Sequence, residues 1–277
     1  MKLTVLMDNN TYIDRYFIGE PGLSYFIESD DKKILFDTGY SDAFMQNAIK
    51  MGIDLLEIDH VVISHGHIDH TWGLEPLSRK FIERKYEGKV NKKPHLVAHP
   101  NIFEEKYLDK TPLGMNLSKE FLENTFALKL SKDPVWITDK LVYLGEIPHK
   151  FKFEVENPIG VRRIDNIDVD DYLLDDSALA FVSKDGLVII TGCSHAGICN
   201  IVEQAKEVTG VSKVSQIIGG FHLINPKAER MEKTKKYMSE LNLNTMYPCH
   251  CTDLKSKFEL AKIVEVKEVG VGLQLEF

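Results

Sequence analysis

The sequence is poor in cysteine, has no excess of basic charge and contains no long apolar run. Its 277 residues include four cysteines, Cys193, Cys199, Cys249 and Cys251, all in the second half. Four are too few for a disulfide scaffold of this size, and their spacings match no common zinc-knuckle pattern. We therefore expect reduced thiols in or near strand ends.

Charge and hydropathy argue against two further classes of protein. The formal net charge is −8, which makes nucleic acid a poor default partner because an acidic surface repels phosphate backbones. No stretch of about 18 apolar residues occurs, so we expect no transmembrane helix. The apolar stretch at the amino terminus is too short for a secretory signal, and a cytoplasmic location is the default expectation.

What the sequence does contain is an alternation of short apolar runs and helical patterns. Strands are expected over residues 3–7, 24–29, 33–36, 60–64, 94–98, 178–183, 187–191, 214–218, 245–247 and 272–277. Helices are expected over residues 42–51, 75–86, 101–107, 200–208, 226–241 and 258–263.

The pattern weakens in one region, and we interpret residues 105–135 as a variable insertion that helps to shape the substrate pocket. Strand pairs and helices occur in a similar order in both halves, about 1–150 and 175–277. This order favours a layered α/β architecture, with residues 1–277 forming a single domain.

The strongest chemical signal is a histidine cluster that follows the apolar segment Val61-Val62-Ile63. His65, His67, Asp69 and His70 place three imidazoles and a carboxylate within six residues. Imidazole nitrogen and carboxylate oxygen are the usual ligands of Zn, Fe and Mn. A polar surface loop is the plainer alternative, but a buried strand rarely ends in imidazoles without partners. The sequence therefore predicts a metal centre.

Four ligands on one short loop can hold one ion, but we expect their side chains to point in different directions, which favours two ions. His65 and His67 would serve one ion, while Asp69 and His70 would serve a second a few ångströms away. Such a pair can hold attacking and leaving oxygens and lower the pKa of a bridging water. We expect one or two divalent transition-metal ions, with zinc as the first choice and iron or manganese as alternatives.

The remaining ligands must come from other strand ends. His195 follows the strand that ends at Thr191, and His250 follows the strand that ends at Tyr247. Each histidine alone could be a capping or core residue. Because the first cluster requires partners, we predict that both are ligands.

Three residues are predicted to act beside the metal. Asp37 ends the strand 33–36 and can accept the N–H of a ligating imidazole, although a plain turn aspartate fits equally well. His222 follows Gly219-Gly220 at another strand end and is predicted to contact the substrate, with ligation as the alternative. Asp69 is both a candidate ligand and a candidate for moving a proton.

A family resemblance is carried by three segments: Phe36-Asp37-Thr38-Gly39, Ser64-His65-Gly66-His67-Ile68-Asp69-His70 and Pro248-Cys249-His250. Their order and spacing resemble the metallo-β-lactamase fold superfamily. The resemblance implies a four-layer αββα sandwich with the metal centre at one edge, between two sheets. Three further segments, 191–197, 219–223 and 250–252, resemble the branch named for dihydropterin–ribofuranosylaminobenzene-phosphate synthase, an enzyme of methanopterin synthesis.

The second half departs from the superfamily pattern at two places. Where many members have a histidine motif, this chain reads Asp175-Asp176-Ser177, and where many have a bridging aspartate, it has Cys193. His195 is the first candidate to replace the missing ligand, and Cys193 as a thiolate is the second. One ion with a loosely bound second is therefore an alternative to two tightly held ions.

The resemblance implies a metal-dependent enzyme that acts on a phosphorylated small molecule. In its most specific form, the resemblance implies transfer from a dihydropterin-methyl diphosphate to an aryl acceptor with release of diphosphate. Hydrolysis of an ester, lactone or phosphodiester needs the same ligands and is the second hypothesis. A low-turnover metal-containing binding or sensor protein is the third. The histidine- and aspartate-rich cluster counts against this third hypothesis, because purely structural metal sites are usually closed by four protein ligands, often cysteines.

Overall fold

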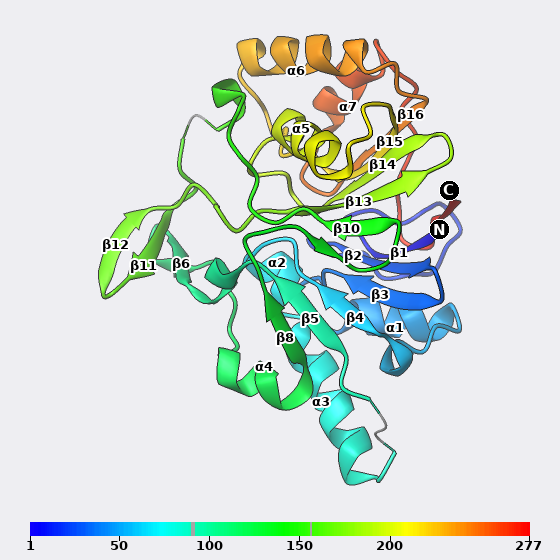
Figure 1. Cartoon of the computed structure of the whole chain (residues 1–277), viewed down its shortest axis with the longest axis vertical. Helices are drawn as coiled ribbons and strands as arrows, with labels where there is room; N and C mark the ends of the chain where they lie inside the picture. Colours follow the sequence, from blue (N-terminus) through cyan, green and yellow to red (C-terminus); the bar gives the residue numbers. More distant parts are fainter. Residues whose placement is uncertain (90–91, 156) are drawn as a thin grey trace.

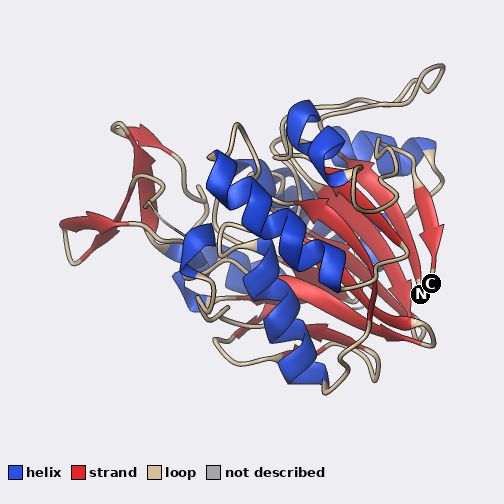
Figure 2. Cartoon of the chain, turned by 90° about the horizontal axis from the view of Figure 1, so that it is seen from above, coloured by secondary structure: helices blue, strands red, loops and turns tan. Residues whose placement is uncertain are grey.

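The computed structural model describes residues 1–89, 92–155 and 157–277. Within these residues, two large β-sheets lie face to face, and helices cover the outer face of each (Figures 1 and 2). This arrangement is the four-layer αββα sandwich predicted from the sequence. None of the described helices is long and apolar enough to cross a membrane.

Each sheet and its helices come mainly from one half of the chain. In order across the first sheet, the described strands are β17 (Gln274–Glu276), β1 (Lys2–Met7), β2 (Ser24–Ser29), β3 (Lys32–Phe36), β4 (His60–Val62), β5 (His95–Ala98) and β8 (Ala127–Leu130). The described strands of the second sheet are β16 (Thr245–Cys249), β15 (Val214–Gly220), β14 (Gly186–Thr191), β13 (Ala178–Ser183), β10 (Leu141–Tyr143) and β9 (Val135–Trp136). The first sheet is covered by α1 (Ala43–Lys50), α3 (Leu74–Tyr86) and α4 (Lys119–Thr125), and the second by α5 (Ile198–Thr209), α6 (Ala228–Glu240) and α7 (Leu254–Leu260).

Alternate residues of the central strands face different layers of the sandwich. Tyr25 and Ile27 of β2 pack between the sheets, whereas Phe26 packs beneath the helices of the first sheet. In β14, Val188 and Ile190 lie between the sheets, and their neighbours face the helices of the second. Both faces of these strands are therefore buried, which explains their nearly continuous apolar sequences. Burial of each large apolar side chain contributes roughly 1.5–3 kcal/mol.

The helix expected over residues 101–107 is wrong. That segment forms a short 3-10 helix, Pro100–Phe103, followed by strand β6 (Glu105–Leu108). The strand forms because β6 pairs with β11 (Val161–Ile164), far along the chain. Together with β7 (Thr111–Pro112) and β12 (Ile167–Asp170), these strands make a small sheet that projects from the sandwich (Figure 1).

The segment 105–135, which we interpret as a variable insertion because its sequence pattern is weak, contains further regular elements. Helix α4 begins at Lys119 and is capped by Ser118, whose side chain accepts a hydrogen bond from the Phe121 backbone N–H. Strand β8 then pairs in parallel with β5 at the edge of the first sheet. Helix α7 begins at Leu254, four residues before the expected start, because the Asp253 side chain caps it.

Parallel pairing places the site at one edge of the sandwich. Strands β3, β4 and β5 are mutually parallel in the first sheet, and β14, β15 and β16 are mutually parallel in the second. The carboxyl ends of parallel strands meet at one edge, where open α/β sheets commonly bind ligands. The predicted site residues all follow these strands, directly or within a few residues. The chain termini lie side by side elsewhere in the molecule, with the amino group of Met1 3.0 Å from the Phe277 carbonyl oxygen (Figure 1).

Candidate metal centre

The loop that follows β4 is held tightly against the second half of the chain. Within it, the Gly66 N–H donates a hydrogen bond of 2.8 Å to Asp175 Oδ2. A Cβ atom at Gly66 would lie 2.9 Å from the Ile102 carbonyl oxygen, so only glycine fits without a shift. The two neighbouring histidines, His65 and His67, are thereby fixed with their rings buried.

Three histidines form one set of candidate ligands, which we call the three-histidine group. Its members are His65, His67 and His195, whose ligand atoms all lie within 4.8 Å of one another. Nε2 of His195 is 3.2 Å from Nε2 of His65. Burial, and then the neighbouring imidazoles, lowers the pKa of His65 well below its ordinary value, and burial lowers that of His67 to about 3. Both rings are therefore neutral, the form that binds metal.

Four further side chains form a second set, which we call the mixed group. It consists of Asp69, His70, Cys193 and His250. Nε2 of His70, Nε2 of His250 and Sγ of Cys193 are each 3.2 Å from the other two, and Asp69 Oδ2 is 3.3 Å from His250 Nε2 and 3.7 Å from His70 Nε2. Tetrahedral zinc with nitrogen, oxygen and sulfur ligands places ligand atoms about 3.3–3.6 Å apart. The mixed group thus matches a tetrahedral ion cage.

Hydrogen bonds fix the ring tautomers in both groups. The Nδ1–H of His70 donates to Asp37 Oδ2 at 2.7 Å, and the Nδ1–H of His250 donates to Asn9 Oδ1 at 2.9 Å. His65 Nδ1 lies 2.9 Å from Ser64 Oγ, whose own proton goes to Asp37 Oδ2. In all three rings it is therefore Nε2, and not Nδ1, that faces the other candidate ligands, as metal binding requires.

The electrostatics of the mixed group also favour a cation. Burial alone would lower the pKa of His70, but the carboxylates of Asp69 and Asp37 raise it to about 9. Burial raises the pKa of Asp69, but His70 and His250 lower it well below its ordinary value. Burial and, second to it, the neighbouring Cys251 thiol raise the pKa of the Cys193 thiol well above its ordinary value. A nearby cation is therefore needed to stabilise the Cys193 thiolate. The donor types, their spacing and this preference for positive charge all fit a divalent transition-metal ion.

Four residues around the two groups have a left-handed backbone conformation. Asp37, Ser194, His222 and His250 all have positive φ, between 47° and 62°. This region is uncommon for residues other than glycine and costs of order 1–3 kcal/mol at each position. Four such residues at neighbouring strand ends mark a site where geometry is maintained at the expense of stability.

His222 belongs to neither ligand group. Its ring packs against that of His195 with centroids 4.3 Å apart, and its Nδ1 is buried without a hydrogen-bond partner among the described residues. It lines two adjoining cavities. The position suits a residue that touches a bound molecule beside the metal.

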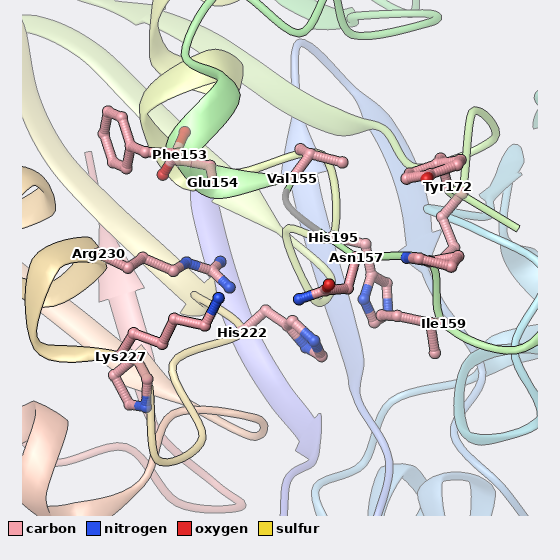
Figure 3. Close-up of a pocket in the computed structure, with 13 residues that line it drawn as sticks. Phe153, Glu154, Val155, Asn157, Ile159, Tyr172, His195, His222, Lys227 and Arg230 are labelled. Atoms are coloured by element: carbon pink, nitrogen blue, oxygen red, sulfur yellow. The ribbon is translucent and has the colours of Figure 1, made fainter.

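The larger cavity opens onto both ligand groups. Its volume is about 500 Å³, and His67, Asp69, Cys193, His195 and His250 all reach it. Its apolar wall includes Leu108, Leu113, Ile159 and Ile224. Two of these wall residues, Leu108 and Leu113, lie in the segment 105–135, so this segment does line the cavity. The smaller cavity, of about 200 Å³, adjoins it and is drawn in Figure 3.

The structure brings together the candidate residues that the sequence indicated. His65, His67 and His195 meet in one group, and Asp69, His70 and His250 in the other, with Asp37 behind His70. His195 and Cys193, considered as alternatives for one missing ligand, lie in different groups. Asn9 was missed, although a polar run directly after the apolar strand β1 was visible in the sequence.

Comparisons with known proteins support this description. A family model for the metallo-beta-lactamase superfamily matches residues 18–250. The 7,8-dihydropterin-6-methyl-4-(beta-D-ribofuranosyl)-aminobenzene-5'-phosphate synthase of Methanocaldococcus jannaschii is 33% identical over 271 residues, covering 93% of this chain and 89% of that protein.

Solved structures resemble the whole chain. Tm1679, described as a metal-dependent hydrolase of the beta-lactamase superfamily, is 30% identical with a TM-score of 0.85, covering 100% of this chain and 99% of that one. The metallo-beta-lactamase fold protein YhfI of Bacillus subtilis is 12% identical with a TM-score of 0.58, covering 100% of this chain and 99% of that one. At that identity the second likeness concerns the fold alone.

Proposed function

Because the chain belongs to the metallo-beta-lactamase superfamily, we propose that it is a metal-dependent enzyme acting on a phosphorylated small molecule. The observation that carries the proposal is the convergence of two separate ligand groups on one cavity of about 500 Å³. Zinc is the first choice of metal, and iron or manganese would suit the same ligands.

The two groups would hold two ions. The three-histidine group supplies three nitrogens, and the mixed group supplies one carboxylate oxygen, two nitrogens and one sulfur. Divalent ions at these places would stabilise negative charge that develops on phosphoryl oxygens. By the resemblance to the superfamily, Cys193 stands at the place of a bridging aspartate, and among the described residues no carboxylate belongs to both groups.

Four side chains in or beside the two ligand groups have separate roles in the proposed reaction. Asp37 keeps His70 in the tautomer that presents Nε2, and Asn9 does the same for His250. The Asp69 side chain is 28% exposed and faces the cavity, so its second oxygen can hold or pass a proton. His222 would contact the substrate from the wall shared by the two cavities.

At the finer level, we propose transfer from a dihydropterin-methyl diphosphate to an aryl acceptor, with diphosphate leaving. The 33% identity to the Methanocaldococcus jannaschii synthase supports this reaction, and the apolar wall of the larger cavity suits planar rings. Hydrolysis of an ester, lactone or phosphodiester is the second candidate. It is favoured by the 30% identity to Tm1679, which is described as a hydrolase.

One assay separates these candidates. The metal-loaded chain is incubated with a dihydropterin-methyl diphosphate, with and without an aryl amine, and both diphosphate and the coupled product are measured. Transfer predicts product that depends on the amine, whereas hydrolysis predicts diphosphate release without it. A tightly retained ligand and no turnover on any phosphorylated, ester or lactone substrate would favour a binding protein and contradict the proposal.

Two variants provide the controls for this assay. The double variant His65→Ala, His67→Ala should lose activity, because it removes two of three nitrogens from one group. His95→Ala removes an exposed histidine at the start of β5 and should retain it. Full activity in the double variant would contradict the site assignment.

A further inference from the structure

Apart from the histidines, one aromatic side chain is found among the described residues that line the larger cavity. That residue is Tyr40, which is 43% exposed. Its ring stacks on the ring of Trp72, with the centroids 5.3 Å apart and the planes 22° apart. Trp72 is outside the described lining, so it supports the Tyr40 ring from behind. Tyr40 is therefore the aromatic surface that a molecule in this cavity would meet.

Hydrogen bonds on both sides hold this pair of rings in a fixed position. Glu20 Oε1 accepts from the backbone N–H of Tyr40 at 3.2 Å and from that of Ser41 at 3.0 Å. The indole N–H of Trp72 donates to the Gly114 carbonyl oxygen at 3.1 Å. A ring that is already held in place loses little conformational entropy when a flat molecule binds to it.

The segment before Tyr40 is also connected to the loop that carries the metal ligands. The backbone N–H and the hydroxyl of Thr38 both donate to the carbonyl oxygen of His70, each at 2.9 Å. His67 and Asp69 of that loop line the same cavity as Tyr40. The backbone therefore fixes the position of Tyr40 relative to the candidate ligands, and one cavity of about 500 Å³ includes both.

The other side chains beside Tyr40 give the cavity an apolar rim. Leu108 is 46% exposed and Ile224 is 61% exposed, and both line the cavity together with Leu113 and Ile159. Exposed apolar side chains gathered around one cavity commonly mark a binding site. No lysine or arginine is among its described lining residues. The metal ions would therefore hold the charged end of a substrate, and the apolar rim and Tyr40 would hold an uncharged part.

We propose that a planar aromatic ring of a substrate stacks on Tyr40, beside the phosphoryl group that the two ligand groups would hold. This inference rests on the proposed function, because it places the ring of the same reaction. It adds that Tyr40 selects molecules that carry such a ring. Stacked aromatic pairs contribute binding energy beyond the apolar area that they bury. The pterin of the donor and the aryl ring of the acceptor share this chemistry.

The test titrates the metal-loaded chain with hydroxymethylpterin, followed by pterin fluorescence, and separately with para-toluidine, followed by calorimetry. Tyr40→Leu should weaken the binding of at least one ring probe about tenfold, because leucine keeps apolar bulk but has no ring face. Tyr40→Phe keeps the ring and should bind within about twofold of the wild type. Tyr86→Leu makes the same exchange at an exposed position of α3 and should have no effect. The probe that responds to Tyr40→Leu identifies the ring as that of the donor or that of the acceptor.

Inorganic diphosphate is the probe that separates the ring from the ions. Its affinity should be the same in the wild type, Tyr40→Leu and Tyr86→Leu, because neither exchange removes a candidate ligand. Equal affinity of the wild type and Tyr40→Leu for both ring probes would overturn the inference. An equal loss of diphosphate binding in Tyr40→Leu would also overturn it, because the exchange would then act through the histidine loop.

Turnover distinguishes the failure of this inference from the failure of the proposed function. Tyr40→Leu should raise KM for an aryl phosphodiester about tenfold, with little change for an alkyl phosphodiester. Ring binding that depends on Tyr40, without turnover of any phosphorylated compound, would uphold the stacking and overturn the proposed function. Turnover with the same preference for the aryl compound in the wild type and Tyr40→Leu would overturn the stacking alone.

Discussion

His70 Nδ1 lies 2.7 Å from Asp37 Oδ2, and both side chains are completely buried. The same carboxylate accepts from the backbone N–H and the hydroxyl of Ser64. Asp37 therefore connects one ligand of the mixed group to the residue that precedes the histidine loop.

Asp37→Asn should weaken metal binding in the mixed group by about 10- to 100-fold. An amide can occupy the same left-handed backbone position, but its nitrogen donates and cannot accept. The variant therefore loses either the two bonds that Asp37 Oδ2 accepts from His70 and the Ser64 hydroxyl or the bond that Oδ1 accepts from the Ser64 N–H. Competition with a chromogenic chelator gives the affinity. Asp30→Asn, at an exposed turn with φ of 46°, is the matched control and should bind as the wild type does. Unchanged affinity in Asp37→Asn would contradict the role of the Asp37 carboxylate.

Cys193 and His195 should affect different ions. Cys193→Ser removes the sulfur of the mixed group, and His195→Ala removes one nitrogen of the three-histidine group. Each variant should lose about half of the bound metal, measured as metal per chain, because the other group remains complete. Cys199→Ala, a buried cysteine of α5, should keep all of it. Loss of all metal in one variant and none in the other would mean that the two groups do not hold separate ions.

Lys106 should matter for stability more than any surface lysine. Its ammonium lies 2.8 Å from Asp171 and 2.9 Å from Asp175, and all three side chains are 1% exposed. Lys106→Met leaves two buried carboxylates without their cation, which should cost about 3–5 kcal/mol of unfolding free energy. Denaturant unfolding measures it, with the exposed Lys129→Met as the control. Asp175 also holds Gly66, so a loss below about 1 kcal/mol would mean the ion pair does not secure the histidine loop.

His60 should make the chain sensitive to acid independently of the metal ligands. Burial, followed by the neighbouring His95, lowers the pKa of His60 from 6.5 to about 4. The unfolded chain takes up a proton at this residue below pH 6.5, whereas the folded chain resists it, so stability falls as the pH drops from 6.5 to about 4. His60→Gln should reduce the decrease in Tm between about pH 7.5 and pH 5. An identical decrease in both proteins would show that His60 has no part in it.

The fold could be predicted from the sequence where a strand or helix has a simple apolar pattern. Strands such as β14 are apolar throughout because both faces are buried, and α3 has a regular apolar face. The small sheet of β6, β7, β11 and β12 was not predicted, because β6 pairs with a strand more than 50 residues away. Asp165 and Asn166, both with positive φ at the turn between β11 and β12, were the local signal that went unused.

The individual ligands of the site could be predicted from the sequence, but their division into two groups could not. His65, His67, Asp69 and His70 could be recognised because their spacing on a strand end is specific to metal binding. Which ion His195 and His250 each serve depends on the distances between strand ends of the two sheets. No local sequence pattern encodes those distances. Lys227 and Arg230 lie at the start of a charged helix, where basic residues usually face solvent, so their place in the lining of a cavity could be learned only from the structure.

The central claim is that the three-histidine group and the mixed group each hold a divalent ion beside one cavity. Anomalous diffraction at the metal absorption edge, from crystals of the metal-loaded chain, tests it most directly. The account predicts two strong peaks, one within about 2.0–2.3 Å of the ligand atoms of each group. A single peak, or peaks bound to other residues, would contradict it.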